Sequence, residues 1–144
     1  MTRSLLAALM VSLWGCGDDD DSSGTGQTCE VAEDCYRSVA GDVPGDPNCF
    51  TNVEGGYCSH TCTSDEECCS LEGECDFGGR GSLEEVCAPF EAFAGTYCFL
   101  SCEDDVLQLL PEDQRDTYCE DISSDLHCRA TGGGDPRRVC LPEG

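Results

Sequence analysis

The 144-residue chain contains no lysine, and its seven basic residues, all arginines, stand against 30 aspartates and glutamates, for a net charge of −23. Binding to nucleic acid or to a bare anionic lipid surface requires neutralising cations, so this balance argues against both as partners. The chain also lacks any apolar run near the roughly 20 residues that a membrane-spanning helix needs. The arginine pair at 137 and 138 is too small to form a basic patch.

Signatures of catalysis and of zinc binding are also missing. The chain has two histidines and neither a G-x-S-x-G nor an H-E-x-x-H motif. His60 has Ser59 and Thr61 beside it and Asp65 nearby, but adjacency in sequence does not build a nucleophile, base and orienting acid in space. His127 is interpreted as a loop residue. No two cysteines are three positions apart, so the C-x2-C pairs of structural zinc sites do not occur. We therefore expect that the protein is not an enzyme and that it has no catalytic, cofactor-binding or metal-binding residues.

The N-terminus is typical of an exported chain. Arg3 precedes a short apolar stretch, Leu5 to Leu13, which matches the hydrophobic region of a secretory signal. The sequence "LWGC", residues 13–16, then resembles the bacterial lipobox, in which the peptide is cut before a cysteine that carries the lipid. We predict a signal peptide at 1–15 and an acyl, palmitate-type attachment at Cys16. A plain signal peptide with Cys16 in a disulfide, or an uncleaved anchor, is the alternative.

The segment after Cys16 is interpreted as a tether. Four consecutive aspartates, Asp18 to Asp21, precede "SSGTGQ". Such a segment cannot bury apolar surface and repels itself into an extended, solvated form. A calcium loop would instead space its carboxylates along a turn with a glycine at the bend. We assign residues 16–28 to an acidic Asp/Ser/Gly tether.

Cysteine is abundant in the rest of the chain. Leu, Ile, Val and Phe make up less than a fifth of the residues after Cys16, too few for an ordinary core, and covalent staples are expected to replace that core. The cysteines beyond Cys16 number 14, an even count that allows seven disulfides with no thiol left over. The residues assigned to disulfides are Cys29, Cys35, Cys49, Cys58, Cys62, Cys68, Cys69, Cys75, Cys87, Cys98, Cys102, Cys119, Cys128 and Cys140.

Recurring cysteine spacings indicate about three repeat units. "CEVAEDC" and "CTSDEEC" share C-x5-C, "GGYCSHTC" matches "GTYCFLSC", and two C-x11-C segments both close in Val-Cys-x-Pro. The units are assigned to 29–61, 62–101 and 102–144. The middle unit holds Cys62, Cys68, Cys75 and either Cys87 or Cys98, and Cys69 is expected to pair with whichever of these two is left. Within each unit we expect the first cysteine to pair with the third and the second with the fourth.

Regular secondary structure should be sparse, because glycine and proline interrupt the short segments between cysteines. Brief strands are predicted at 97–100 and 137–141. The exception is the insertion at 103–118, where Val106, Leu107 and Leu110 recur at helical spacing and Pro111 favours the first turn of a second helix. The sequence therefore predicts a small, irregular, loop-dominated disulfide-rich fold with short strands and one or two short helices. The apolar side of the insertion either packs on the unit beneath it or binds a partner.

The lipobox-like "LWGC", the tether and the "C-x5-C … YC-x3-C" units together resemble the cysteine-rich lipoproteins that some bacteria export. The segment "DEECCSLEGEC" is similar to the CC-x5-C step of small disulfide domains in toxins and inhibitors. The first resemblance implies lipid anchoring at an outer membrane or periplasmic face and no particular activity.

These observations predict a lipid-anchored, non-catalytic surface or interaction module. Its partners would be the membrane, through the N-terminal lipid, and an unidentified protein or glycan that docks on the Cys102–Cys119 loop. The alternative is a small secreted inhibitor or toxin-like effector that presents a disulfide-held loop such as 78–85.

Overall fold

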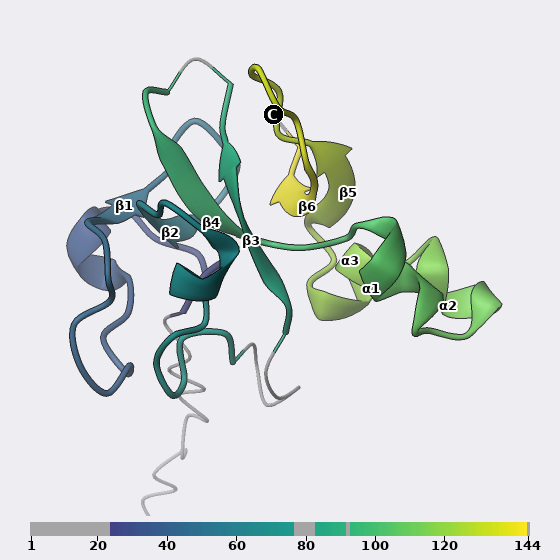
Figure 1. Cartoon of the computed structure of the whole chain (residues 1–144), viewed down its shortest axis with the longest axis horizontal. Helices are drawn as coiled ribbons and strands as arrows, with labels where there is room; N and C mark the ends of the chain where they lie inside the picture. The colour runs from purple at the N-terminus through teal and green to yellow at the C-terminus, as the bar shows by residue number, and fades with distance from the viewer. Residues whose placement is uncertain (1–23, 77–82, 92, 144) are drawn as a thin grey trace, which may run out of the picture.

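The computed structural model describes residues 24–76, 83–91 and 93–143, which form three β-hairpins in succession (Figure 1). Each hairpin is a separate two-stranded antiparallel sheet. The pairs are β1 (Pro47–Cys49) with β2 (Cys58–His60), β3 (Glu85–Pro89) with β4 (Thr96–Leu100), and β5 (Leu126–Ala130) with β6 (Arg138–Pro142). Strands β4 and β6 confirm the two strands that the sequence predicts.

In every hairpin, one cysteine on the first strand lies directly opposite one cysteine on the second strand. These pairs are Cys49 and Cys58, Cys87 and Cys98, and Cys128 and Cys140. The two opposed cysteines do not bond to each other, and each bonds instead to a cysteine in the segment that precedes the hairpin. Each hairpin is therefore stapled twice to its own leading segment.

The disulfides in the outer units follow the predicted first-to-third and second-to-fourth order. They are Cys29–Cys49 and Cys35–Cys58 in the first unit, and Cys102–Cys128 and Cys119–Cys140 in the last. In the middle unit this order predicts Cys62–Cys75, which is wrong, because Cys62 bonds to Cys87; Cys68 bonds to Cys98. The small, disulfide-rich, loop-dominated fold is confirmed.

The predicted assignment of Cys69 and Cys75 is wrong. Cys75 is not part of the repeating set, and Cys69 bonds to Cys75 rather than to Cys87 or Cys98. Both hairpin cysteines are already taken by Cys62 and Cys68, and the backbone at Cys69 turns away with a φ of +76°. The nearest free sulfur is then six residues along the chain, across a turn in which Gly73 has a φ of +86°.

Short helices fill the segments between the first and second cysteine of each unit. The first two units hold single 3-10 turns, η1 (Ala32–Asp34) and η2 (Asp65–Glu67). The longer third segment holds α1 (Asp104–Gln108) and α2 (Glu112–Arg115), and α3 (Tyr118–Ile122) continues beyond the predicted 103–118 insertion. Pro111 directly precedes α2 as its N-cap residue. Helix α3 carries Cys119, so its disulfide to Cys140 fixes this extra helix to β6.

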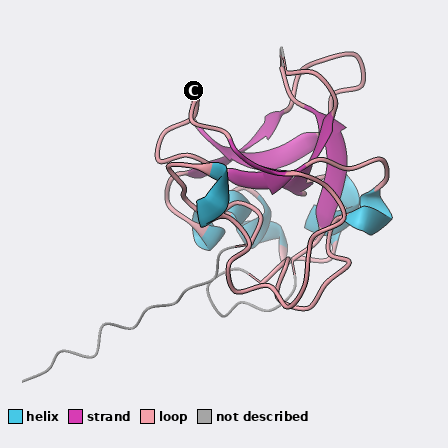
Figure 2. Ribbon diagram, turned by 90° about the vertical axis from the view of Figure 1, so that its left-hand side faces the viewer, coloured by secondary structure: helices cyan, strands magenta, loops and turns pink. Residues whose placement is uncertain are grey.

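The strands gather in the middle of the molecule, and the helices lie at its periphery (Figure 2). Strand β4 is central, because isolated bridges join Thr61 to Tyr97 and Ser101 to Val139 and so link the three hairpins. The main core packs against β4 and is rich in aromatic rings. Its fully buried members include Phe50, Tyr57, Phe90, Phe99, Leu100 and Leu141.

The described end of the predicted tether is not solvated. Residues 24–26 are buried, and the Gly26 N–H donates to Cys58 O at 2.9 Å while the Cys58 N–H donates to Gln27 O at 2.8 Å. A Cβ at Gly24 would lie 2.2 Å from the Glu74 carbonyl oxygen, so glycine is required for this close approach. The prediction of an extended tether through residue 28 is therefore wrong for 24–26, and residues 16–23 lie outside the described residues.

Candidate functional site

A group of buried polar side chains lies where the first and second units meet. His60 and Glu74 have no exposed side-chain surface, and His60 Nε2 lies 2.7 Å from Glu74 Oε1. The other ring nitrogen, Nδ1, lies 2.9 Å from Thr61 O. Because both ring nitrogens face acceptors, the ring is fully satisfied when both carry a proton.

The Glu74 carboxylate is also held from its other side. The Leu71 N–H donates to Oε2 at 2.9 Å. Burial by itself would raise the pKa of Glu74, but the hydrogen bonds from His60 and from backbone N–H groups outweigh it and hold the pKa below its ordinary value. The group is therefore a buried, ionised Glu74 carboxylate that is hydrogen-bonded to the His60 ring.

Glu85, at the start of β3, is the second acid of this group. Its side chain is buried, and neither carboxylate oxygen makes a hydrogen bond of ordinary geometry among the described residues. The nearby Thr25 hydroxyl, which opposes the rise in the pKa of Glu85, is hydrogen-bonded to Tyr36 OH at 2.8 Å. Burial raises the pKa of Glu85 well above its ordinary value, and the negative charge of Glu74 raises it further. This environment favours the protonated acid.

The carboxyl group of Glu85 lies beside the disulfide that departs from the repeat. A carboxylate oxygen and the sulfurs of Cys69 and Cys75 all lie within 4.8 Å of one another. Cys75 is buried, whereas Cys69 is partly exposed and lines an open hollow of about 460 Å³. Other residues at this hollow are Asp65, Glu66, Cys68, Leu83, Glu84 and Glu85.

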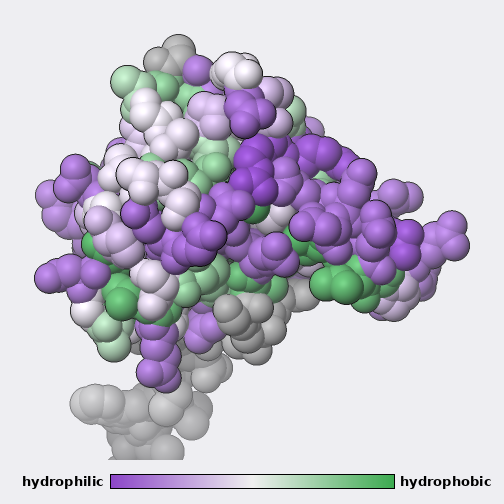
Figure 3. Space-filling view, in the orientation of Figure 1, coloured by the Kyte–Doolittle hydropathy of each residue, from purple (hydrophilic) through white to green (hydrophobic). Residues whose placement is uncertain are grey.

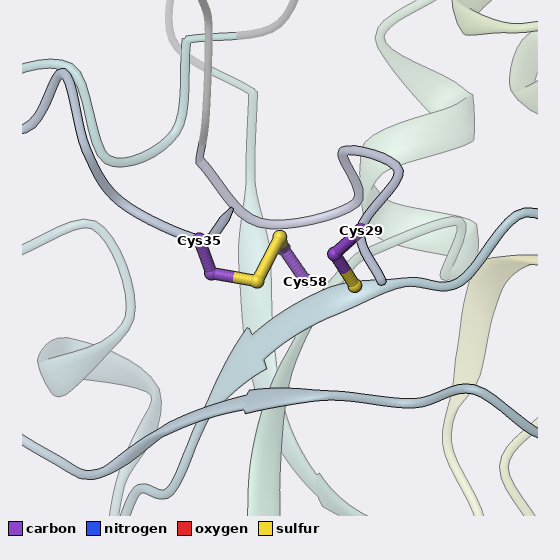
Figure 4. A group of neighbouring side chains, drawn as sticks. All are labelled: Cys29, Cys35 and Cys58. Carbon is purple, nitrogen blue, oxygen red and sulfur yellow. A yellow bond between two sulfur atoms is a disulfide. The ribbon is translucent and has the colours of Figure 1, made fainter. Parts of the chain in front are cut away.

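Three further groups of cysteines lie close enough together to surround an ion, but their sulfurs are paired in disulfides. In one of them, Cys35 bonds to Cys58, and Cys29 beside them bonds to Cys49 (Figure 4). The other two groups are Cys62, Cys68 and Cys98, and Cys102, Cys119 and Cys128. Metals bind the thiolate, so these groups in the oxidised protein are neighbouring disulfides rather than ligand sets.

The residues that stand near His60 in the sequence do not join it in space as a catalytic set. Ser59 Oγ donates to Cys98 O at 2.7 Å, and Asp65 accepts from the Cys87 N–H and from Arg137. The interpretation of His127 as a loop residue is wrong, because it lies in β5 opposite Leu141. Its ring forms a half-exposed pair with Glu120, 3.0 Å from Nδ1 to Oε1. Glu74 and Glu85 were not predicted as site residues, because nothing in the local sequence pattern distinguishes them from the many exposed acids.

The helical insertion packs mainly against the body of the protein. Val106 is buried and Leu107 contacts the main core, whereas the side chain of Leu109 is 82% exposed. A shallow groove of about 190 Å³ lies alongside, lined by Leu83, Leu110, Gln114, Tyr118, Asp121 and Ile122. The predicted apolar side is therefore used for packing, and Leu109 and the groove remain open to solvent.

Cys16 and the predicted signal peptide lie outside the described residues. Within the described ranges, the helices are too short and too polar to cross a membrane. No protein-family model matches the chain, and neither a curated protein nor a solved structure shows significant similarity to it. The seven disulfides identify an extracytoplasmic protein that folds in an oxidising environment.

Proposed function

We propose that the chain is a lipid-anchored, non-catalytic interaction module, held through Cys16 at a bacterial outer membrane or periplasmic face. The observation that carries this proposal is the disulfide count. All 14 cysteines after Cys16 are paired with one another, so Cys16 has no cysteine partner within its own chain. An unpaired cysteine directly after an apolar export signal is the residue that a lipobox would modify.

The anchor is tested by the intact mass of the membrane-extracted protein, measured before and after reduction with alkylation of thiols. We expect an acylated N-terminal Cys16 and 14 alkylatable thiols that appear only after reduction. A Cys16→Ser variant should keep its seven disulfides but leave the membrane fraction. A wild-type chain that is water-soluble and unacylated would refute the anchor.

The proposed docking surface is Leu109 with the neighbouring groove, which we call the insertion surface. The insertion carries many acids, among them Asp104, Asp105, Glu112, Asp113 and Asp116, and hydrophilic residues cover most of the face shown in Figure 3. An exposed leucine among acids is complementary to an apolar side chain flanked by arginine or lysine. The occupant that we propose is a basic protein segment of this kind.

The insertion surface is tested with peptides that carry one leucine or phenylalanine between arginines, and with the same peptides carrying glutamates. We expect only the basic peptides to bind, with an affinity that falls as salt is added. Leu109→Asp should weaken binding about tenfold or more, whereas Val31→Asp, at a 51% exposed position on the first unit, should leave binding unchanged. Equal binding by the two variants would contradict the proposal.

One contact supports the alternative of an inhibitor that presents a loop. The Leu83 N–H donates to Cys75 O at 3.1 Å, which closes the base of the loop between these residues, while residues 78–82 of the predicted 78–85 loop lie outside the described residues. Inhibition of a panel of serine proteases by the refolded chain, and its loss on mutation of this loop, would favour the inhibitor over the interaction module.

A further inference from the structure

The Cys69–Cys75 disulfide has no counterpart in the other two units. The six remaining disulfides each tie a hairpin to its leading segment across 20 to 30 residues, whereas Cys69 and Cys75 are six residues apart. A short loop removes less entropy from the unfolded chain than a long one, so this bond is the least useful of the seven as a staple. We therefore expect the Cys69–Cys75 bond to have a role other than stabilising the fold.

The chemistry around this disulfide is also distinctive. The Glu85 carboxyl group is buried, makes no hydrogen bond of ordinary geometry in the described part of the chain, and lies within 4.8 Å of both sulfurs. An unsatisfied buried acid is costly, and such groups are retained where chemistry uses them. The partly exposed Cys69 gives the disulfide an entrance from solvent through the open hollow, and Cys75 is buried next to the acid.

We propose that Cys69–Cys75 is an exchangeable disulfide that oxidises external thiols, with Glu85 as the proton donor to the Cys75 sulfur. This activity goes beyond the proposed anchoring and docking functions and does not depend on them.

The exchange proceeds in two balanced steps. An external thiolate attacks Cys69 Sγ, a mixed disulfide forms, and the Cys69–Cys75 bond breaks with its electron pair on the Cys75 sulfur, which takes the Glu85 proton. A second external thiolate then attacks the external sulfur of the mixed disulfide and releases Cys69 as a thiolate, which is protonated by solvent. Two external thiols are oxidised to one disulfide, Cys69 and Cys75 are reduced to thiols, and Glu85 regains its proton from water.

The surroundings of the disulfide also predict which thiols it accepts. Glu66 and Glu84 are exposed at the hollow, so an anionic thiol would be repelled there and a neutral or cationic thiol would not. In the disulfide form, Cys69 Sγ lies 3.4 Å from Leu83 O, a carbonyl oxygen that would accept a hydrogen bond from the Cys69 thiol after reduction. The preferred substrate class is thus a neutral or basic thiol or dithiol.

The first test uses the exported full-length chain and limiting dithiothreitol, followed by thiol alkylation and peptide mass mapping. We expect the first two thiols to appear together on Cys69 and Cys75, at least tenfold sooner than on any other pair. First reduction of any other disulfide would overturn the proposal. For monothiols, the rate of reaction with the protein is divided by the rate with an unstructured disulfide peptide. We expect this ratio to be highest for cysteamine, lower for 2-mercaptoethanol and lowest for 3-mercaptopropionate. An absence of this order would refute the predicted selectivity.

The second test compares Glu85→Gln with Glu84→Gln, an exposed acid at the same hollow. Glu85→Gln should slow reduction of Cys69–Cys75 about tenfold or more, because the leaving sulfur loses its acid, while Glu84→Gln should not. The groups that face Glu85 are Tyr36, Tyr57 and Glu74. Since a rising pH removes the Glu85 proton, the ratio of the wild-type rate to the Glu85→Gln rate should fall as pH rises. Equal rates for the two variants would refute the role of Glu85. If Glu85→Gln fails to fold, the peptide mass mapping of the wild-type protein still tests whether Cys69–Cys75 is the exchangeable disulfide.

Discussion

His60 and His127 make the same kind of contact in two different environments. In each, a ring nitrogen lies within hydrogen-bonding distance of a glutamate carboxylate. The His60 and Glu74 side chains are fully buried, whereas the His127 and Glu120 side chains are each 38% exposed. Breaking a buried pair leaves an uncompensated charge in the interior, whereas an exposed pair is replaced by water. The two histidines therefore form a matched comparison.

His60→Ala should lower the free energy of unfolding by about 3 to 5 kcal/mol, because Glu74 would remain buried without its partner. His127→Ala should cost at most about 1 kcal/mol. Denaturant unfolding with the disulfides intact measures both values. Equal losses would mean that the Glu74 carboxylate finds water or another donor once His60 is removed.

Glu85 should make stability depend on pH. Its pKa in the folded protein is raised, so its contribution is fully present below the unfolded value and is lost as pH rises through the folded pKa. Glu85→Gln removes this titration, and its advantage over the wild type should therefore grow with pH. Unfolding between roughly pH 4 and 9 checks the sign, with Glu84→Gln as the control that should follow the wild type.

At the residue scale, composition predicted little of this group. The sequence drew attention to His60 and to its neighbours Ser59, Thr61 and Asp65. Of these, Thr61 contacts the ring through its backbone carbonyl, and the side-chain partner of the ring is Glu74, 14 residues along the chain. With 30 acidic residues, no local pattern shows which acids are buried. Burial depends on how the second unit packs on the first, and this is a tertiary property.

At the scale of elements, cysteine spacing was a partial guide to the repeat. The C-x5-C pairs mark the leading segments of the first two units, and the C-x3-C pairs join the last strand of a hairpin to the next unit. The C-x11-C match was misleading, because Cys128 and Cys140 are opposed across a hairpin whereas Cys75 lies outside the hairpin of Cys87. Cys69 was the exception, since Cys62 and Cys68 already bond to both hairpin cysteines and Cys69 bonds to Cys75. The extra helix α3 could not be separated from the insertion because its packing is set by the Cys119–Cys140 bond.

The two kinds of disulfide should differ in their effect on stability. Replacing Cys69 and Cys75 together by serine removes a six-residue cross-link, which the chain-entropy relation values at about 2 kcal/mol. The same change at Cys62 and Cys87, 25 residues apart, should cost about 3.5 kcal/mol. Denaturant unfolding of the two double variants compares them, and a larger loss at Cys69 and Cys75 would show that this bond is chiefly structural.

At the scale of the whole molecule, Arg137 joins the second unit to the third. Its Nη1 lies 2.7 Å from Asp65 Oδ1, and its Nε donates to Glu103 Oε1 at 2.9 Å. These hydrogen bonds raise the already high pKa of Arg137, and the guanidinium group is permanently charged. The guanidinium group of the neighbouring Arg138 forms an ion pair with the largely exposed Asp104.

Arg137→Ala should therefore destabilise the protein by about 1 to 2 kcal/mol, since two acids from different units lose their shared partner. Arg138→Ala should change stability by less than about 0.5 kcal/mol. Thermal unfolding at low and high salt distinguishes the two, because screening should reduce the Arg137 effect only in part. Identical behaviour of the two variants would show that the units are held together by the core alone.

The sequence by itself determined the class of the molecule. An acidic chain with few large apolar residues and an even set of 14 cysteines after Cys16 has to be stapled by disulfides, and composition and counting are sufficient for that conclusion. The tertiary structure alone decided that Cys69 bonds to Cys75, that Glu74 and Glu85 are buried, and that residues 24–26 pack against the body. Spacing is a local property of the chain, whereas sulfur pairing and the burial of an acid depend on which distant segments the packed hairpins bring into contact.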